Sequence, residues 1–264
     1  MIATAGSGHP ASSLGLADFF VCLYQEALQH DPTAPTWPKR DRFVVSNGHI
    51  APVWYATLAE EGYFPVEELL TLRKFHSRLQ GHPVRGSLPG VENSSGSLGQ
   101  GLAYASGLAL SAKLKKEAHH VYCLMGDGEQ QEGSVWESYW FVGHNKLTNL
   151  TAIIDLNGIQ SEDRVEDVLS MKDFEKRLSA LGWKTIEVDG HNHSAIIKAL
   201  DMARSPLHSV AILLKTIPGK GVSFMENNKT WHAKAPSSEE KELALKELEA
   251  LDALDGSAEL EGGK

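Results

Sequence analysis

The chain has 264 residues, 42% hydrophobic and 22% charged, which is the composition of a folded globular protein and excludes disorder throughout. Its 34 Asp and Glu against 25 Lys and Arg give a net charge of −9, which disfavours nucleic acid and anionic membranes as partners. No apolar run reaches the ~18 residues of a membrane span, and Lys39 is the first basic residue, so a secretory leader is not expected. We therefore expect a soluble, cytoplasmic protein.

Helical patterns alternate with short apolar segments along the chain. An apolar stripe over 17–28 predicts a first helix, and later helices are predicted over 98–116, 134–144, 171–181 and 194–204. Segments rich in Val, Ile and Leu, typical of strands buried on both faces of a sheet, cover 42–46, 121–128, 150–158, 183–190 and 209–219. This order predicts an α/β fold with a doubly wound, mostly parallel sheet of about five or six strands and helices on both faces.

Two segments depart from this alternation. Residues 76–100 are rich in Gly, Ser and Pro, and loops this long in a compact domain are often functional. Beyond Pro236 the composition changes, and Ser237 with Glu240 has the spacing of a capping box. We expect one domain over 1–236, an amphipathic helix over 237–251 and a disordered tail over 252–264.

A Gly-Asp-Gly turn, Gly126 to Gly128, follows the second predicted strand, and the next strand ends at Asn157. The carboxyl ends of parallel strands meet at one edge of the sheet, where ligands bind. Asp127 and Asn157 offer hard oxygen donors of the kind that Mg²⁺ or Ca²⁺ prefers. The glycines let backbone N–H groups approach a phosphate. A lone Gly-Asp-Gly is more often a tight turn, but the pair predicts a diphosphate held through a divalent metal.

Motifs that combine glycine with histidine or acidic residues recur in a fixed order along the chain. They are Ser7–Pro10 (SGHP), Ser46–His49 (SNGH), Gly81–Pro83 (GHP), Gly96–Gly101 (GSLGQG), Gly126–Gly128 with Gln131–Gly133, and Gly219–Gly221 with Thr230–His232. The Gly-Asp-Gly to Asn spacing is similar to the thiamine diphosphate signature, although its usual Asn-Asn ending is Leu156-Asn157 here. From residue 6 to about 250, the set resembles the N-terminal, diphosphate-binding half of transketolase.

The resemblance implies a thiamine diphosphate cofactor and Mg²⁺, for which Ca²⁺ can substitute. The implied metal ligands are the side chains of Asp127 and Asn157 and the main-chain carbonyl of Ile159. The residues implied to bind the cofactor are His49, Gly96, Ser97, Leu98, Gly126, Asp127, Gly128, Glu129, Asn157, Ile159 and His232.

The resemblance also implies catalytic roles. His9 resembles a histidine that faces the substrate hydroxyls, His82 one at the substrate channel, and His232 one near the reacting centre. Glu132 resembles an interface glutamate that couples two cofactor sites. Imidazole, with an ordinary pKa of about 6.5, can donate to phosphate or move a hydroxyl proton near neutral pH. Taken singly, each histidine fits a solvated loop residue as well, and Glu132 fits an exposed helical turn.

Other histidines that stand in pairs are not assigned to the site. We expect His119 and His120 at the exposed start of a strand, and His191 and His193 at the entry to a helix. The family usually carries a helix before the SGHP motif, whereas five residues precede Gly6 here, so that helix is expected to be clipped or absent.

Transketolases divide the cofactor between two domains, and the resemblance places the second domain on another polypeptide. We expect the N-terminal subunit of a two-chain transketolase, with two copies of each chain. It would transfer a two-carbon ketol unit from a ketose, or its phosphate, to an aldose. The partner would carry the pyrimidine-binding domain and a third domain, and this chain alone would be inert. Alternatives are a related thiamine diphosphate ketotransferase or carboligase for an unusual sugar, a non-catalytic scaffold subunit, and a stand-alone nucleotide- or phosphate-binding domain.

Overall fold

A single parallel sheet forms the centre of the molecule. The computed structural model describes residues 1–161, 163–204 and 207–261. The strands lie in the order β1 (Arg42–Val45), β2 (Val121–Gly126), β3 (Leu150–Leu156), β5 (Ser209–Lys215) and β4 (Trp183–Asp189). Every neighbouring pair is parallel, which confirms the predicted sheet. β5 ends at Lys215, before the predicted limit at 219, because its pairing with β3 and with β4 ends at that residue.

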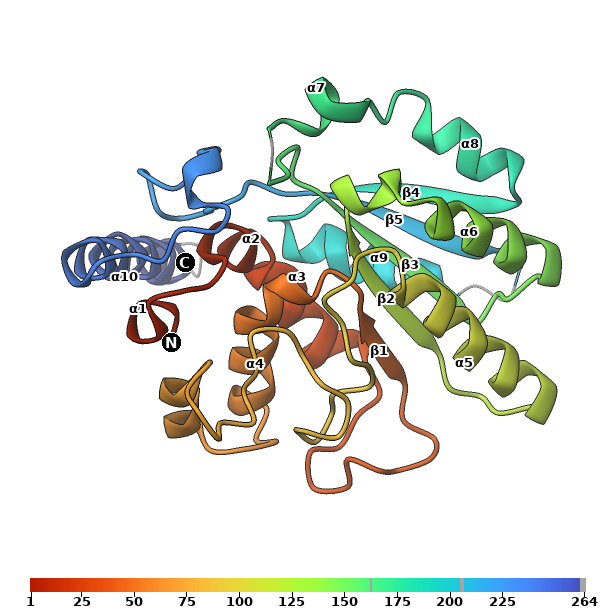
Figure 1. The fold of residues 1–264 in the computed structure, drawn as a ribbon, viewed down its shortest axis with the longest axis horizontal. Helices are drawn as coiled ribbons and strands as arrows, with labels where there is room; N and C mark the ends of the chain where they lie inside the picture. Colours follow the sequence, from red (N-terminus) through yellow and green to blue (C-terminus); the bar gives the residue numbers. More distant parts are fainter. Residues whose placement is uncertain (162, 205–206, 262–264) are drawn as a thin grey trace.

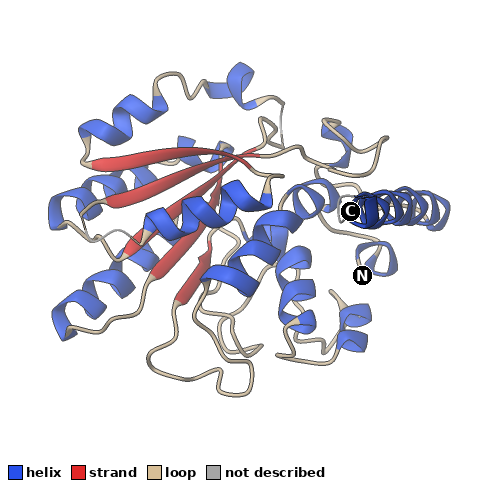
Figure 2. Cartoon of the chain, turned by 180° about the vertical axis from the view of Figure 1, so that it is seen from behind, coloured by secondary structure: helices blue, strands red, loops and turns tan. Residues whose placement is uncertain are grey.

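The sheet has a buried core on each face, as the near-continuous apolar strands predict. Successive side chains of β1 point to opposite faces, so Phe43 and Val45 join one core whereas Val44 joins the other. Helices α5 (Gly101–Lys115), α6 (Gly133–Asn145) and α8 (Phe174–Ala180) pack against one face (Figure 1). Helices α3 (Ala17–Cys22), α4 (Ala51–Glu60) and α9 (His193–Ala203) cover the other (Figure 2). The doubly wound, three-layer architecture is confirmed.

The predicted first helix over 17–28 is divided in the structure. It becomes α3 and a π-helix, η1 (Leu23–Ala27), and a separate helix α2 (Pro10–Gly15) lies before α3. A short helix, α1 (Ile2–Ala5), precedes the SGHP motif. α2 begins with proline, which suits a first helical position because its missing N–H has no partner there. Val21, part of the predicted apolar stripe, is 42% exposed, because the buried face of the helix carries Phe19 and Leu23 instead.

The connections between the longer helices and strands contain further short helices. They are η2 (Gly48–Ile50), η3 (Val66–Thr71), η4 (Gly128–Gln131), α7 (Val165–Leu169) and η5 (Lys229–Trp231). The predicted long loop over 76–100 lies between η3 and α5 and has no helix of its own.

The C-terminal helix α10 (Ser238–Glu261) begins with the predicted capping box. The Ser237 N–H donates to Glu240 Oε2 at 2.7 Å, and the Glu240 N–H donates to Ser237 Oγ at 3.1 Å. The backbone stays helical past the predicted end at 251, through Ala, Leu and Glu residues that favour helix. Residues 262–264 lie outside the described part, and disorder of the tail stays a prediction. No helix in the described ranges has both the length and the apolar character that a membrane crossing requires.

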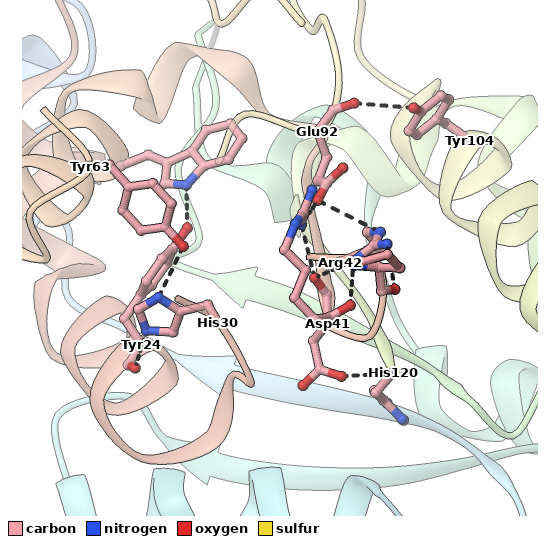
Figure 3. Close-up of polar contacts among 11 residues, drawn as sticks. Tyr24, His30, Asp41, Arg42, Tyr63, Glu92, Tyr104 and His120 are labelled. Atoms are coloured by element: carbon pink, nitrogen blue, oxygen red, sulfur yellow. Dashed lines mark hydrogen bonds and ion pairs between the residues drawn. The ribbon is translucent and has the colours of Figure 1, made fainter. Parts of the chain in front are cut away.

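A buried polar network closes the amino edge of the sheet (Figure 3). Asp41, 2% exposed, accepts from the His120 N–H at 2.7 Å and pairs with Arg204. Glu92 pairs with Arg40, and its carbonyl accepts from Tyr104 Oη. His119 and His120 are 7% and 5% exposed, so the expectation of an exposed strand start is wrong. Arginine–carboxylate pairs cover the N-terminal ends of β1 and β2. The network therefore lies at the edge of the sheet opposite the candidate site.

Candidate active site

A cavity of about 480 Å³ lies at the carboxyl edge of the sheet. β1, β2 and β3 all end here, because parallel strands deliver their C-terminal turns to one edge. The predicted site residues that line it are His9, His49, His82, Gly96, Leu98, Gly126, Asp127, Gly128, Glu129, Glu132, Asn157, Ile159 and His232. Ser97 lines a neighbouring opening with Ser95 and Tyr104. Fold topology thus gathers residues from distant parts of the chain into one cavity.

Sequence reasoning missed several residues that line the cavity. They are Asn47, Gln131, Asp155, Gln160 and Ser161. Asn47 lies within the SNGH motif and Asp155 two residues before Asn157, so proximity to named motifs was an available signal. Nothing in the sequence pattern distinguishes Gln160 or Ser161.

Three imidazole rings meet on one wall of the cavity. The ring centroids lie 5.0 Å apart for His9 and His49, 5.6 Å for His9 and His232, and 5.6 Å for His49 and His232. Burial, with smaller effects from the neighbouring histidines and, for His9, from Arg73, lowers the pKa of His9 to about 4 and that of His49 to about 3. Both rings are therefore neutral near pH 7, and each offers one N–H donor and one acceptor nitrogen.

Two buried polar atoms on residues that line the cavity have no hydrogen-bond partner within the described residues. They are His9 Nδ1 and Asn47 Oδ1. His9 precedes α2, and its carbonyl accepts from Ser13 Oγ at 2.8 Å, so the backbone that carries the ring is fixed. A buried polar atom without a partner is costly. The geometry therefore fits a cavity that binds a polar ligand.

Asp127 joins the turns that follow β2 and β3. Its Oδ1 accepts from the Gly128 N–H at 2.7 Å and its Oδ2 from the Gly158 N–H at 2.6 Å. Asn157 Nδ2 donates to Asp155 Oδ2 at 2.8 Å, and Asn157 Oδ1 accepts from the Ile159 N–H at 2.9 Å. These bonds fix the amide orientation of Asn157. A carboxylate, an amide oxygen and the Ile159 carbonyl belong to one rigid pair of turns.

The electrostatics of these turns favour a cation. Burial, and then the charge of Asp155, raises the pKa of Asp127 to about 7. Burial likewise raises the pKa of Asp155 to about 6, opposed by hydrogen bonds from Thr216 and Asn157. No three His, Cys, Asp or Glu side chains in the described part of the chain group as a metal site, so a metal here would also use amide and carbonyl oxygens. That donor set suits Mg²⁺.

Glu129 ties three loops together beneath the cavity. The side chain is 2% exposed and accepts from Ser46 Oγ, from the Gly99 N–H at 2.6 Å and from the Gly126 N–H at 3.3 Å. Burial raises the pKa of this carboxyl. Because three donors from three separate loops bind this one carboxylate, the geometry assigns Glu129 to holding the loops, and its contact with a cofactor stays a prediction.

The mouth of the cavity carries the two remaining predicted residues. His82 is solvent-exposed in the long loop, and partial burial followed by the charge of Arg73 lowers its pKa. Glu132 is exposed at the N-terminus of α6. Both lie where a substrate or a second chain can reach them. Their catalytic roles stay predictions.

Comparison with known proteins agrees with this geometry. Residues 1–252 match the family model described as the transketolase, thiamine diphosphate binding domain. Mouse transketolase is 41% identical over 245 residues, which cover 92% of this chain. The crystal structure of transketolase from Campylobacter jejuni superposes with a TM-score of 0.87 at 34% identity, covering 93% of this chain and 40% of that one. The chain therefore belongs to the transketolase family, as the thiamine diphosphate binding domain.

The relatives differ in how much of their length the chain matches. It spans 39% of mouse transketolase. It spans 90% of the 6-deoxy-6-sulfo-D-fructose transketolase subunit SqwG of Clostridium sp. strain MSTE9, at 37% identity over 249 residues and 94% of this chain. A Pichia stipitis transketolase in complex with sedoheptulose 7-phosphate superposes with a TM-score of 0.86 at 31% identity, covering 92% of this chain and 38% of that one.

Proposed function

We propose that the chain is the diphosphate-binding, N-terminal subunit of a two-chain transketolase. The observation that carries the proposal is a single cavity in which the imidazoles of His9, His49 and His232 face the oxygen donors of Asp127 and Asn157. Imidazole and backbone N–H groups suit a diphosphate, and the oxygen donors suit the divalent metal that would accompany it.

The residues present fit the cofactor. Asp127, Asn157 and the Ile159 carbonyl would hold Mg²⁺, with Ca²⁺ as a substitute. The backbone at Gly126 and Gly128 would approach the diphosphate, with His49 and His232 as donors; Gly96, Ser97 and Leu98 would border the cofactor. When bound, thiamine diphosphate supplies the nucleophilic carbon that a ketose needs for cleavage next to its carbonyl.

The chain's own contribution is orientation and proton handling. His9 and His82 would bind substrate hydroxyls and move protons at those oxygens. The low pKa of His9, about 4, keeps the ring neutral near pH 7, so it offers one N–H donor and one acceptor nitrogen to a substrate hydroxyl. Glu132, exposed at the mouth of the cavity, would lie at the interface between subunits and couple this cofactor site to a second one.

The partner would be a different chain that carries the pyrimidine-binding domain and a third domain, two copies of each chain forming the complex. The proposal is supported by the coverage of SqwG, a relative named as a subunit, over nine-tenths of its length. Full transketolases are matched over about two-fifths of theirs. Two buried free cysteines, Cys22 and Cys123, are compatible with a reducing, cytoplasmic location.

A second candidate substrate class follows from the same relative. SqwG is named for 6-deoxy-6-sulfo-D-fructose, so a sulfonated ketose is an alternative donor to a phosphorylated one.

The test is ketol transfer by the complex that co-purifies with this chain, carrying a C-terminal affinity tag, from its own source. The donor panel contains fructose, fructose 6-phosphate and 6-deoxy-6-sulfofructose, each with an aldose phosphate acceptor, thiamine diphosphate and Mg²⁺. We expect transfer from at least one ketose and none without the partner chain. A complex that binds the cofactor and transfers from no ketose would contradict the proposal.

A further inference from the structure

Asp18 and His191 form a hydrogen-bonded pair outside the cofactor cavity. They line a separate open cleft of about 940 Å³ together with His193, Lys220 and Glu247. His191 Nδ1 lies 2.8 Å from Asp18 Oδ2, and His193 Nε2 lies 2.8 Å from Asp18 Oδ1. The hydrogen bond from His191 is the largest cause that lowers the pKa of Asp18. The pair joins α3 to the segment between β4 and α9.

The second nitrogen of His191 identifies its tautomer. His191 Nε2 lies 2.8 Å from the backbone nitrogen of Ile217, which can only donate. Nε2 must therefore be the unprotonated acceptor, and the ring proton must lie on Nδ1, donated to Asp18. Asp18 thus fixes the form of the ring that captures the Ile217 N–H.

Ile217 belongs to the segment that follows β5. This segment is connected to the candidate site by two separate sets of contacts. The preceding residue, Thr216, donates from Oγ1 to Asp155 Oδ1. Asp155 in turn accepts from Asn157 Nδ2 at 2.8 Å. Each link is a buried or half-buried hydrogen bond, and Asp155 is 1% exposed.

In the other direction the segment holds α2. The Gly219 N–H donates to the Ala11 carbonyl at 2.8 Å, and a Cβ on Gly15 would lie 2.9 Å from the Ile217 carbonyl oxygen. α2 begins directly after His9. The Ile217 segment is therefore clamped between the turn that carries Asn157 and the helix that follows His9.

We propose that the Asp18–His191 pair is a positioning device that fixes the segment after β5 and, through Thr216 and Asp155, the orientation of Asn157. The inference rests on the proposed function, because Asn157 is a metal ligand only there. Groups that orient a metal ligand from outside the coordination sphere commonly change metal affinity by about 10- to 100-fold when they are removed.

Two conservative variants separate the two contacts of His191. The amide of Asn reaches about as far as Nδ1, so His191→Asn can keep the bond to Asp18 and loses the acceptor for Ile217. The amide of Gln reaches about as far as Nε2, so His191→Gln can still accept from the Ile217 N–H. His193→Asn is the matched control, since His193 also contacts Asp18 but does not contact Ile217.

The first readout needs neither cofactor nor partner. Nitrogen-15 NMR of the histidine side chains reports the tautomer, and amide exchange reports protection of Ile217. We expect the Nδ1–H tautomer at His191, and faster exchange of Ile217 in His191→Asn than in His191→Gln or His193→Asn. An Nε2–H tautomer at His191 would overturn the inference whatever the chain catalyses.

The second readout is the Mg²⁺ concentration that gives half-maximal thiamine diphosphate binding by the native complex. We expect an increase of about tenfold or more in His191→Asn, a smaller one in His191→Gln and none in His193→Asn. Equal Mg²⁺ requirements in all three variants and the wild type would overturn the positioning role. A wild-type complex that binds no cofactor would instead contradict the proposed function. The NMR readout would then still test whether the Asp18–His191 pair fixes Ile217.

Discussion

Asp127 Oδ2 accepts a hydrogen bond of 2.6 Å from the backbone N–H of Gly158. This bond joins the turn after β2 to the turn after β3, and so sets the separation between the carboxylate of Asp127 and the amide of Asn157. The two turns are 31 residues apart in the sequence and adjacent because β2 and β3 are parallel neighbours.

Asp127→Ala is expected to weaken Mg²⁺-dependent binding of thiamine diphosphate by about 100-fold or more, because it removes the only charged oxygen of the proposed metal ligands. The fold should persist, since the loss of the acceptors for the N–H groups of Gly128 and Gly158 is partly offset by removing a buried carboxylate. Calorimetric titration of the complex measures the affinity and circular dichroism the fold. Asp163→Ala, an exposed acid paired with Lys229, is the control; unchanged cofactor affinity in Asp127→Ala would refute the metal assignment.

Glu129→Ala is expected to lower the free energy of unfolding by about 3 kcal/mol, because it leaves three buried donors without an acceptor. The donors are Ser46 Oγ and the N–H groups of Gly99 and Gly126. Urea unfolding measures the change, and Glu129→Gln should recover part of it by retaining one acceptor oxygen. A loss below about 1 kcal/mol would show that Glu129 does not hold these loops.

Two glycines of α5 make a matched pair. A Cβ on Gly101 would lie 2.3 Å from Ser46 Cβ, whereas a Cβ on Gly107 would meet no atom within 4 Å. Gly107→Ala should therefore stabilise the chain by about 0.5–1 kcal/mol through helix propensity. Gly101→Ala should destabilise it by about 2 kcal/mol or more through overpacking. Thermal unfolding of both variants is the measurement; the same sign for both would contradict the packing around Ser46.

Acid should destabilise the ligand-free chain through its buried histidines. Burial lowers the pKa of His120 from 6.5 to about 3 in the folded state, so between these pH values the unfolded chain binds more protons. The free energy of unfolding therefore rises with pH over this range. The contribution of His120 is complete above a pH of about 6.5 and is lost as the pH falls. The His120 contribution lost at pH 5 is about 2 kcal/mol.

The check is urea unfolding of the wild type and His120→Gln from pH 7 to pH 5. The variant should show a flatter pH dependence, whatever its stability at pH 7. Parallel curves would mean that His120 is not held neutral by its burial beside Thr151.

Local pattern was enough to predict the sheet and most of the cavity. Apolar strands ending in Gly, Asp or Asn identify the parallel sheet, and its carboxyl edge then collects His49, Asp127 and Asn157 without further information. The motifs also predict His9 as a site residue, although it precedes α2 and does not follow a strand. These features depend on residues that are close in sequence or on strand order.

Contacts between distant segments were not predictable in this way. The Thr216–Asp155 bond joins residues 61 apart, and the His191–Ile217 bond depends on the order of β4 and β5. The burial of His120 depends on Asp41 and Thr151, which no periodicity reveals. Ser97 belongs to the GSLGQG motif yet lines the neighbouring opening, which membership of the motif does not reveal.

We propose that this chain works as one subunit of a two-chain, thiamine diphosphate enzyme. Native mass spectrometry of the tagged chain, purified from its own source with thiamine diphosphate and Mg²⁺ present, tests it most directly. We expect a complex with a second, different chain, two copies of each, that carries bound cofactor and metal. A cofactor-free monomer, or a homodimer without a second kind of chain, would contradict it.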